Sequence, residues 1–217
     1  MILSGQILIG AQRAETAGAL VDQEVEIKIK GEHQAYVSRG GLKLEAALRE
    51  FQIQVNGKIC ADLGASTGGF TDCLLKHGAA RVHAFDVGKG QLDWRLRQDP
   101  RVVVHDDFNV RNLTPSDVGE PVDLMTLDLS FISLTRVLPA LRAFSAVEIV
   151  ALVKPQFEAR REEVGPGGII RSPELQAEIV GRVKSFAAGA GFELLGETPS
   201  PIPGQKGNRE FLLRLKA

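Results

Sequence analysis

The chain of 217 residues has few cysteines and few aromatic side chains, and neither sign of charge is in excess. Its two cysteines, Cys60 and Cys73, are too few for a disulfide scaffold, and no second pair of cysteine or histidine residues has the spacing of a metal site. We therefore expect two reduced, buried thiols and no metal. Lysine and arginine number 26 against 27 acidic residues, so a local basic patch would have to hold any nucleic-acid partner.

Long apolar runs are missing as well. No stretch approaches the roughly 18 apolar residues of a membrane-spanning helix, and residues 1–6 lack the basic region and apolar core of a secretory signal. We expect a cytoplasmic protein without a membrane partner. What is present, 44% hydrophobic and 24% charged residues, is typical of a folded chain long enough for one α/β domain, with or without a short appendage.

The chain changes character near residues 31–34. Before this point, residues 6–9 and 24–30 alternate between polar and apolar side chains and predict short strands, too few to fold alone. After it, apolar residues recur at the spacing of an amphipathic helix. These residues are Leu44, Ala47, Leu48 and Phe51. We therefore predict a small first domain at 1–32 and a large second domain at 33–217.

Within the second domain, short apolar runs alternate with helical stretches. The runs predict strands at 59–63, 81–85, 102–104, 122–127 and 147–153. A helix from Ser172 to about Ala190 and two closing strands, near 192–197 and 209–215, follow them. Such alternation predicts an α/β fold whose mostly parallel sheet has helices on both faces and binds ligands outside the carboxyl ends of its strands.

The segment from Ala61 to Asp72, with the sequence ADLGASTGGFTD, joins the first of these strands to a helix. A strand, a glycine-rich turn and a helix bring backbone N–H groups to a helix N-terminus, which favours an anionic group. We expect the segment to hold S-adenosylmethionine, with the carboxylate of the cofactor at the helix and its ammonium group near Asp62. The expected contacts are Asp62, Gly64, Ser66, Gly68, Gly69 and Phe70.

Two later strand ends offer groups for the rest of a nucleoside. Asp86 and Val87 follow the second strand, where an acid about 20 residues beyond the glycines is placed for ribose hydroxyls. After the third strand, Asp106 or Asp107 is placed for the adenine amino group and Phe108 for the face of the ring.

The spacing of the loop leaves a second cofactor open. Gly64, Ser66 and Gly69 occupy the three positions of the G-x-G-x-x-G turn of dinucleotide enzymes, with serine in the middle. An NAD-dependent oxidoreductase is therefore an alternative that binding of S-adenosylhomocysteine or NAD would decide.

Asp128 and Lys154 end the fourth and fifth strands and should face each other. A lysine at the end of a buried sheet tends to lose its proton, whereas a nearby carboxylate favours the charged form, so the pair can tune one amine. Such an amine can orient or deprotonate a hydroxyl nucleophile. A structural ion pair is the alternative.

At five motifs the chain resembles the TlyA family, often labelled haemolysin-like, whose catalytic domain is similar to FtsJ-type RNA 2′-O-methyltransferases. The motifs are YVSRGGLKL (36–44), ADLGASTGGFTD (61–72), DLSFIS (128–133), VKPQFE (153–158) and GNREF (207–211). The resemblance implies a Rossmann-like class I methyltransferase fold with a seven-stranded sheet. It also implies S-adenosylmethionine as the cofactor and, as the activity, methylation of a cytidine ribose in ribosomal RNA.

The family's Lys-Asp-Lys-Glu tetrad maps onto Lys43, Asp128, Lys154 and Glu210. By this resemblance, Lys154 activates the ribose 2′-hydroxyl and Asp128 holds and tunes Lys154. Lys43 and Glu210 complete the polar cluster around the substrate ribose. The implied partner is ribosomal RNA or a ribosomal subunit, while the oligomeric state stays open.

The family's N-terminal RNA-binding domain, of the type named after ribosomal protein S-four, is matched only in its strand-rich second half. Residues 1–32 are therefore expected to be a truncated form of it. Four basic residues are further candidates for an RNA-facing patch, namely Arg95, Arg97, Lys206 and Arg209. A noncatalytic RNA-binding protein and a membrane-active haemolysin are the remaining alternatives, although no strongly basic amphipathic helix supports the latter.

Overall fold

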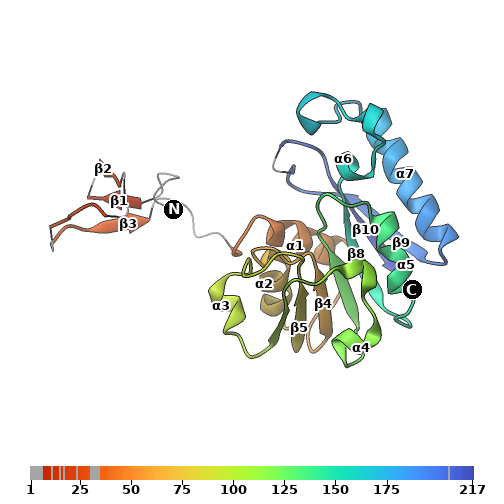
Figure 1. Ribbon diagram of the computed structural model, residues 1–217, viewed down its shortest axis with the longest axis horizontal. Coiled ribbons are helices and arrows are strands. Elements are labelled where there is room, and N and C mark those ends of the chain that lie inside the picture. The colour runs from red at the N-terminus through yellow and green to blue at the C-terminus, as the bar shows by residue number, and fades with distance from the viewer. Residues whose placement is uncertain are drawn as a thin grey trace. The chain divides into compact units, whose positions relative to one another are not determined.

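The computed structural model describes residues 7–10, 12–14, 16, 18–22, 24–29, 35–204 and 206–217. The chain separates into two compact units, Met1–Ala35 and Tyr36–Ala217 (Figure 1). The boundary predicted between residues 32 and 33 lies outside the described residues, as do residues 6 and 30 at the outer ends of the two strands predicted in the first unit.

The first unit contains a small antiparallel sheet. Its strands are β1 (Ile7–Ile9), β2 (Gln12–Arg13) and β3 (Ile27–Ile29), in the order β2-β1-β3. The alternating pattern predicts β1 and β3 but not β2, because two polar residues carry no periodicity.

The second unit is built on a sheet of seven strands. They are β4 (Ile59–Leu63), β5 (Arg81–Phe85), β6 (Val102–His105), β7 (Leu124–Leu127), β8 (Glu148–Val153), β9 (Glu193–Pro199) and β10 (Phe211–Lys216). Their order is β6-β5-β4-β7-β8-β10-β9, with the first five parallel and β10 antiparallel to both neighbours. The predicted α/β fold with a mostly parallel sheet is confirmed. The carboxyl ends of β4, β5, β7 and β8 therefore meet at one edge.

Helices cover both faces of this sheet (Figure 1). The helices are α1 (Gly40–Glu50), α2 (Gly69–Lys76), α3 (Trp94–Arg97), α4 (Pro115–Val118), α5 (Leu138–Leu141), α6 (Pro155–Glu158) and α7 (Pro173–Gly189), and four 3-10 turns lie at Val110–Asn112, Leu134–Arg136, Arg161–Glu163 and Pro166–Gly168. Side chains of α1 and α2 form one core with one face of the strands, and those of α5 and α7 form a second core on the other face. Successive residues of a strand therefore point into the two cores in turn.

The local signals of the sequence are reproduced. Ser172 caps α7, accepting a hydrogen bond from Leu175 N at 3.2 Å, and the face of α1 that carries Leu44 is buried as its spacing predicts. Cys60 and Cys73 are free and buried. No helix in the described ranges combines the length and the apolarity that crossing a membrane requires.

Candidate active site

The turn after β4 has a shape that only glycine allows at two positions. Gly64 has a φ of +88°, and a Cβ atom there would lie 2.7 Å from the backbone oxygen of Asp128. At Gly69, a Cβ atom would lie 2.2 Å from Ser38 Oγ. The turn therefore packs closely against the segment after β7 and the segment before α1.

Two adjoining cavities open at the carboxyl ends of the strands, one of about 170 Å³ and one of about 590 Å³. We call them the small and the large cavity. Their walls share Gly64, Ser66, Asp128 and Ser130. A ligand that fills both would therefore pass between the glycine turn and the end of β7.

Most of the residues predicted to bind a cofactor lie on these walls. Gly69 and Phe70 line the small cavity, whereas Asp86, Val87 and Phe108 line the large one. Asp86 is held in place, because Oδ2 accepts from Ser66 N at 2.8 Å and Oδ1 from Gly88 N at 2.7 Å. Gly68 is the exception in the turn. It is the N-cap residue of α2, with a φ of +98°, and a Cβ atom there would lie 2.3 Å from Leu96.

Asp62, which is predicted to lie near the ammonium group of the cofactor, is placed beneath the glycine turn. This side chain is fully buried and lines neither of the two cavities within the described part of the chain. Its carboxylate accepts hydrogen bonds from Thr71 Oγ1 at 2.7 Å and Thr126 Oγ1 at 3.0 Å. Burial raises the pKa of Asp62 to about 7. Asp62 therefore ties β4 to α2 and β7 from beneath the turn.

Asp106 and Asp107, two described residues that are predicted to be placed for the adenine amino group, line neither of the two cavities. The guanidinium of Arg97 takes the Asp106 carboxylate, with Nη2 at 2.7 Å and 2.8 Å from its two oxygens, and this ion pair lowers the pKa of Asp106. Sequence reasoning missed eight residues that do line the large cavity, although four of them lie in the DLSFIS motif. The eight are Gln91, Asn109, Val110, Arg111, Leu129, Ser130, Phe131 and Ile132.

The four residues of the predicted tetrad come together as two ion pairs. Lys154, which follows β8, places Nζ 2.6 Å from Asp128 Oδ1 at the end of β7. Lys43 of α1 donates to Glu210 Oε2 at 2.5 Å, just before β10. Lys43, Asp128 and Lys154 line the small cavity, and Glu210 reaches it through Lys43. The predicted approach of Asp128 and Lys154 is thus reproduced.

A family model described as FtsJ-like methyltransferase matches residues 36–217, which is the whole of the second unit. The chain belongs to the FtsJ-like methyltransferase family. This result decides against an NAD-dependent oxidoreductase, because that alternative rested only on the spacing of the glycine turn.

Relatives of this FtsJ-like chain extend over nearly its full length. The 16S/23S rRNA (cytidine-2′-O)-methyltransferase TlyA of Mycobacterium tuberculosis is 48% identical, over 100% of this chain and 82% of that protein. A solved structure from Streptococcus thermophilus that carries a hemolysin name is 44% identical, with a TM-score of 0.84 over 99% of this chain and 80% of that one. An S-adenosylmethionine-dependent methyltransferase from Aquifex aeolicus, 19% identical over 83% and 94% of the chains, has the same fold at a TM-score of 0.56.

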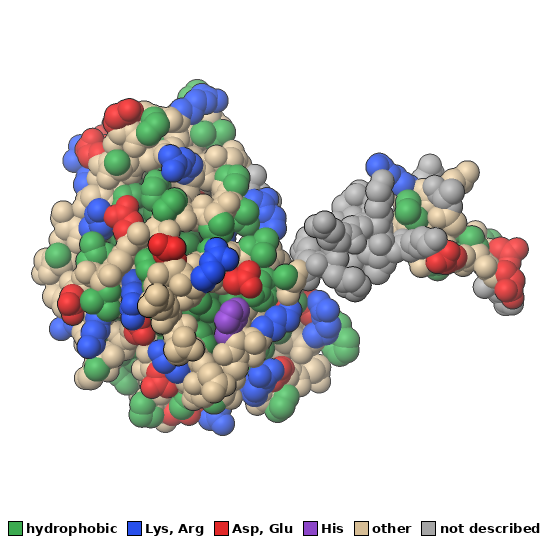
Figure 2. Space-filling model, turned by 180° about the vertical axis from the view of Figure 1, so that it is seen from behind, with side chains coloured by type: hydrophobic (Ala, Val, Ile, Leu, Met, Phe, Trp, Pro, Cys, Tyr) green, Lys and Arg blue, Asp and Glu red, His purple; other side chains and the backbone are tan. Residues whose placement is uncertain are grey.

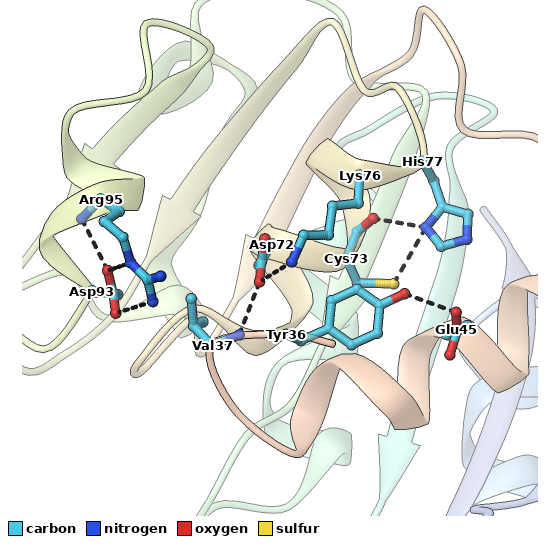
Figure 3. A network of polar contacts seen from close by, with 9 residues as sticks. All are labelled: Tyr36, Val37, Glu45, Asp72, Cys73, Lys76, His77, Asp93 and Arg95. Carbon is cyan, nitrogen blue, oxygen red and sulfur yellow. Dashed lines mark hydrogen bonds and ion pairs between the residues drawn. The ribbon is translucent and has the colours of Figure 1, made fainter. Parts of the chain in front are cut away.

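In this methyltransferase the segment that precedes α1 is fastened to α2 (Figure 3). Val37 N donates to Asp72 Oδ2 at 2.9 Å, and Lys76 donates to the same oxygen at 3.0 Å. Tyr36 donates its hydroxyl to Glu45 on α1 at 2.9 Å. These contacts fix the position of Ser38, which lines the small cavity.

Two of the four residues predicted to form an RNA-facing patch pair with acids. Arg95 pairs with Asp93 at 3.1 Å, and Arg97 pairs with Asp106. On the face of the larger unit shown in Figure 2, lysine and arginine side chains are likewise interspersed with aspartate and glutamate. An attraction for RNA on this face therefore depends on individual basic groups rather than on a continuous positive area.

Proposed function

We propose that this chain is an S-adenosylmethionine-dependent methyltransferase that modifies the ribose 2′-hydroxyl of a cytidine in ribosomal RNA. The observation that carries the proposal is the Lys154–Asp128 pair in the wall between two cavities. The printed name of the M. tuberculosis relative, a 16S/23S rRNA (cytidine-2′-O)-methyltransferase, supplies the substrate class. Ribosomal RNA as the substrate implies action in the cytoplasm.

The walls of the large cavity fit the donor. Asp86 can accept from ribose hydroxyls, and the ring of Phe108 offers an apolar wall to adenine. The N-terminus of α2, at the end of the glycine turn, favours a carboxylate, and the missing Cβ atoms of Gly64 and Gly69 leave backbone close to the ligand. When bound, the cofactor supplies a methyl group on a positively charged sulfur.

The small cavity fits the carboxylate end of the donor on its side at the N-terminus of α2, and the acceptor on its side lined by Lys43, Asp128 and Lys154. In the proposed reaction Lys154, once deprotonated, would take the proton of the 2′-hydroxyl, and the ribose oxygen would receive the methyl group that the bound cofactor supplies in place of its bond to sulfur. Asp128 stabilises the ammonium group that results, and Lys43 with Glu210 shapes the polar wall opposite. A positioned base of this kind contributes about 100- to 10,000-fold in rate.

The first unit is proposed to assist binding to ribosomal RNA through strands of a domain of the ribosomal protein S-four type. Its three-stranded sheet agrees with the strand-rich half of such a domain.

The deciding experiment measures transfer of labelled methyl groups to small and large ribosomal subunits and to free ribosomal RNA by the wild-type protein, Lys154→Ala and Asp128→Ala. We expect transfer by the wild type, with the label on a cytidine ribose, and loss of about 100-fold or more in both variants. Calorimetry should show binding of S-adenosylhomocysteine and not of NAD. A wild type inactive on every form of RNA, or an equally active Lys154→Ala, contradicts the proposal.

A further inference from the structure

The segment after β7 and the segment after β8 are joined at two points. At the first, Lys154 Nζ lies 2.6 Å from Asp128 Oδ1 and donates to Ser130 Oγ at 2.8 Å. At the second, Glu158 accepts from Ser133 Oγ at 2.5 Å and from Leu134 N at 2.8 Å. Lys154 immediately precedes the single turn of α6 and Glu158 is its last residue, so both contacts come from one short segment.

Between these two points the chain is strained. Phe131 has a φ of +63°, which a bulky side chain rarely adopts and which costs about 1–3 kcal/mol. Its ring is 91% exposed, with one aromatic contact at 5.0 Å to Phe157. Little burial therefore compensates the strain at Phe131, and the conformation has to be imposed from both sides. Ser130 and Ser133, which flank the strained residue, make the contacts that impose it.

The first point also limits the direction of the amine. A neutral lysine amine has two N–H groups and one lone pair. In the structure the amine donates to Ser130 Oγ at 2.8 Å, whereas its contact with Asp128 Oδ1 is an ion pair without hydrogen-bond geometry. Ser130 therefore fixes the direction of one N–H group, and the lone pair of the deprotonated amine can face a group entering the small cavity, which Lys154 and Ser130 both line.

We propose that Ser130 is a positioning residue that fixes the direction of the Lys154 amine, and that Glu158 acts through Ser133 and Leu134 to hold the strained segment carrying Ser130. The inference rests on the proposed role of Lys154 as the base. Ser130 carries no part of the proton transfer itself.

The burial of an acid at position 158 agrees with such a function. Burial raises the pKa of Glu158, so the charged carboxylate is costly at this place. The two hydrogen bonds that it accepts from the strained segment offset part of this cost. A glutamine would keep both contacts, accepting from Leu134 N and donating to Ser133 Oγ, whereas an alanine would lose both.

The test compares steady-state methyl transfer by Ser130→Ala, Ser130→Thr, Glu158→Ala and Glu158→Gln. We expect the two alanine variants to lower kcat by about 10- to 100-fold, with the KM for the donor and the affinity for S-adenosylhomocysteine within about twofold of the wild type. Ser130→Thr and Glu158→Gln should recover most of kcat. Because both residues act on one amine, the double alanine variant should lose much less than the product of the single losses.

Two controls separate orientation from folding. Ser172→Ala removes the cap of α7, and Glu163→Gln weakens the ion pair of Glu163 with Arg182; both should lower thermal stability without changing kcat. If transfer depends on Lys154 but Ser130→Ala keeps the wild-type kcat, or if the two alanine losses multiply, the inference is overturned. Failure of the proposed function has a different signature, namely a wild type that transfers no methyl group or a Lys154→Ala variant that does.

Discussion

The Lys43–Glu210 pair and the Lys154–Asp128 pair contain the same two chemical groups, yet their carboxylates differ in exposure. The Glu210 side chain is 3% exposed and lies against Gly204, where a Cβ atom would come within 2.3 Å of Oε1. The Asp128 side chain is 22% exposed and lines both cavities. The first carboxylate is enclosed, whereas the second is open to a ligand.

The difference in carboxylate exposure indicates that the two ion pairs have different functions. An enclosed ion pair has to stay paired, because each charge has lost its water and has little else to interact with. A pair at a cavity wall can change partners when a ligand enters. We therefore expect Lys43 and Glu210 to support the site and Lys154 and Asp128 to meet the reacting groups.

Replacing each lysine by arginine tests most directly whether the two ion pairs differ in function. Arginine keeps the positive charge but does not give up a proton, so it cannot serve as a base. Lys154→Arg should lower the rate of methyl transfer by about 100-fold or more, while Lys43→Arg should keep at least about a tenth of it. Single-turnover transfer to ribosomal RNA measures both. Equal losses would remove the distinction between the pairs.

Removing each carboxylate should lower the free energy of unfolding by a different amount in the two pairs. Glu210→Ala leaves the ammonium of Lys43 buried without its partner and should lower the free energy of unfolding by about 3–5 kcal/mol. Asp128→Ala leaves the ammonium of Lys154 at a cavity wall with Ser130 as a remaining partner and should cost only about 1–2 kcal/mol. Urea denaturation of both variants against the wild type tests this order. A larger cost for Asp128 would contradict it.

Asp62 is a third acid, fully buried, and its partners are hydroxyl groups rather than a lysine. Its pKa is raised from 3.8 to about 7, so the folded state favours the protonated form. The stabilising contribution is complete below about pH 4 and is lost as the pH rises to about 7, a change of about 4 kcal/mol. Asp62→Asn, which stays neutral, should lack this loss. Unfolding measured at several pH values should show the variant gaining on the wild type as pH rises; parallel curves would refute the assignment.

The smallest expected effect is on cofactor binding in the large cavity, which Asp86 lines. Asp86→Asn removes the charge opposite Ser66 N and should weaken binding of S-adenosylhomocysteine by about tenfold, or about 1.4 kcal/mol. The two arginine variants should leave this affinity unchanged. Asp93→Asn, a change of the same kind at an acid paired with Arg95, is the matched control. Unaltered calorimetric affinity of Asp86→Asn would place the ribose elsewhere.

The sequence predicted the glycine turn and the strand ends well, because both depend on short local patterns. Gly64 and Asp86 follow apolar runs that form β4 and β5 within the predicted bounds. For Asp106 and Asp62, local patterns do not reveal the partners that the folded chain provides. Asp106 is captured by Arg97 on α3, and Asp62 lies one residue before the strand end, where the pleat turns it under α2.

By itself, then, the sequence determined where the chain turns tightly, which strands are parallel and buried, and which polar residues stand at their carboxyl ends. Only the tertiary structure decided that Lys43 meets Glu210, 167 positions away, and that Ser130 and Glu158 hold the segment around Phe131. The two kinds of feature differ in the sequence separation of the residues that determine them. Turns and strand ends follow from backbone preferences within a few residues, whereas these contacts depend on how helices and loops pack on the finished sheet.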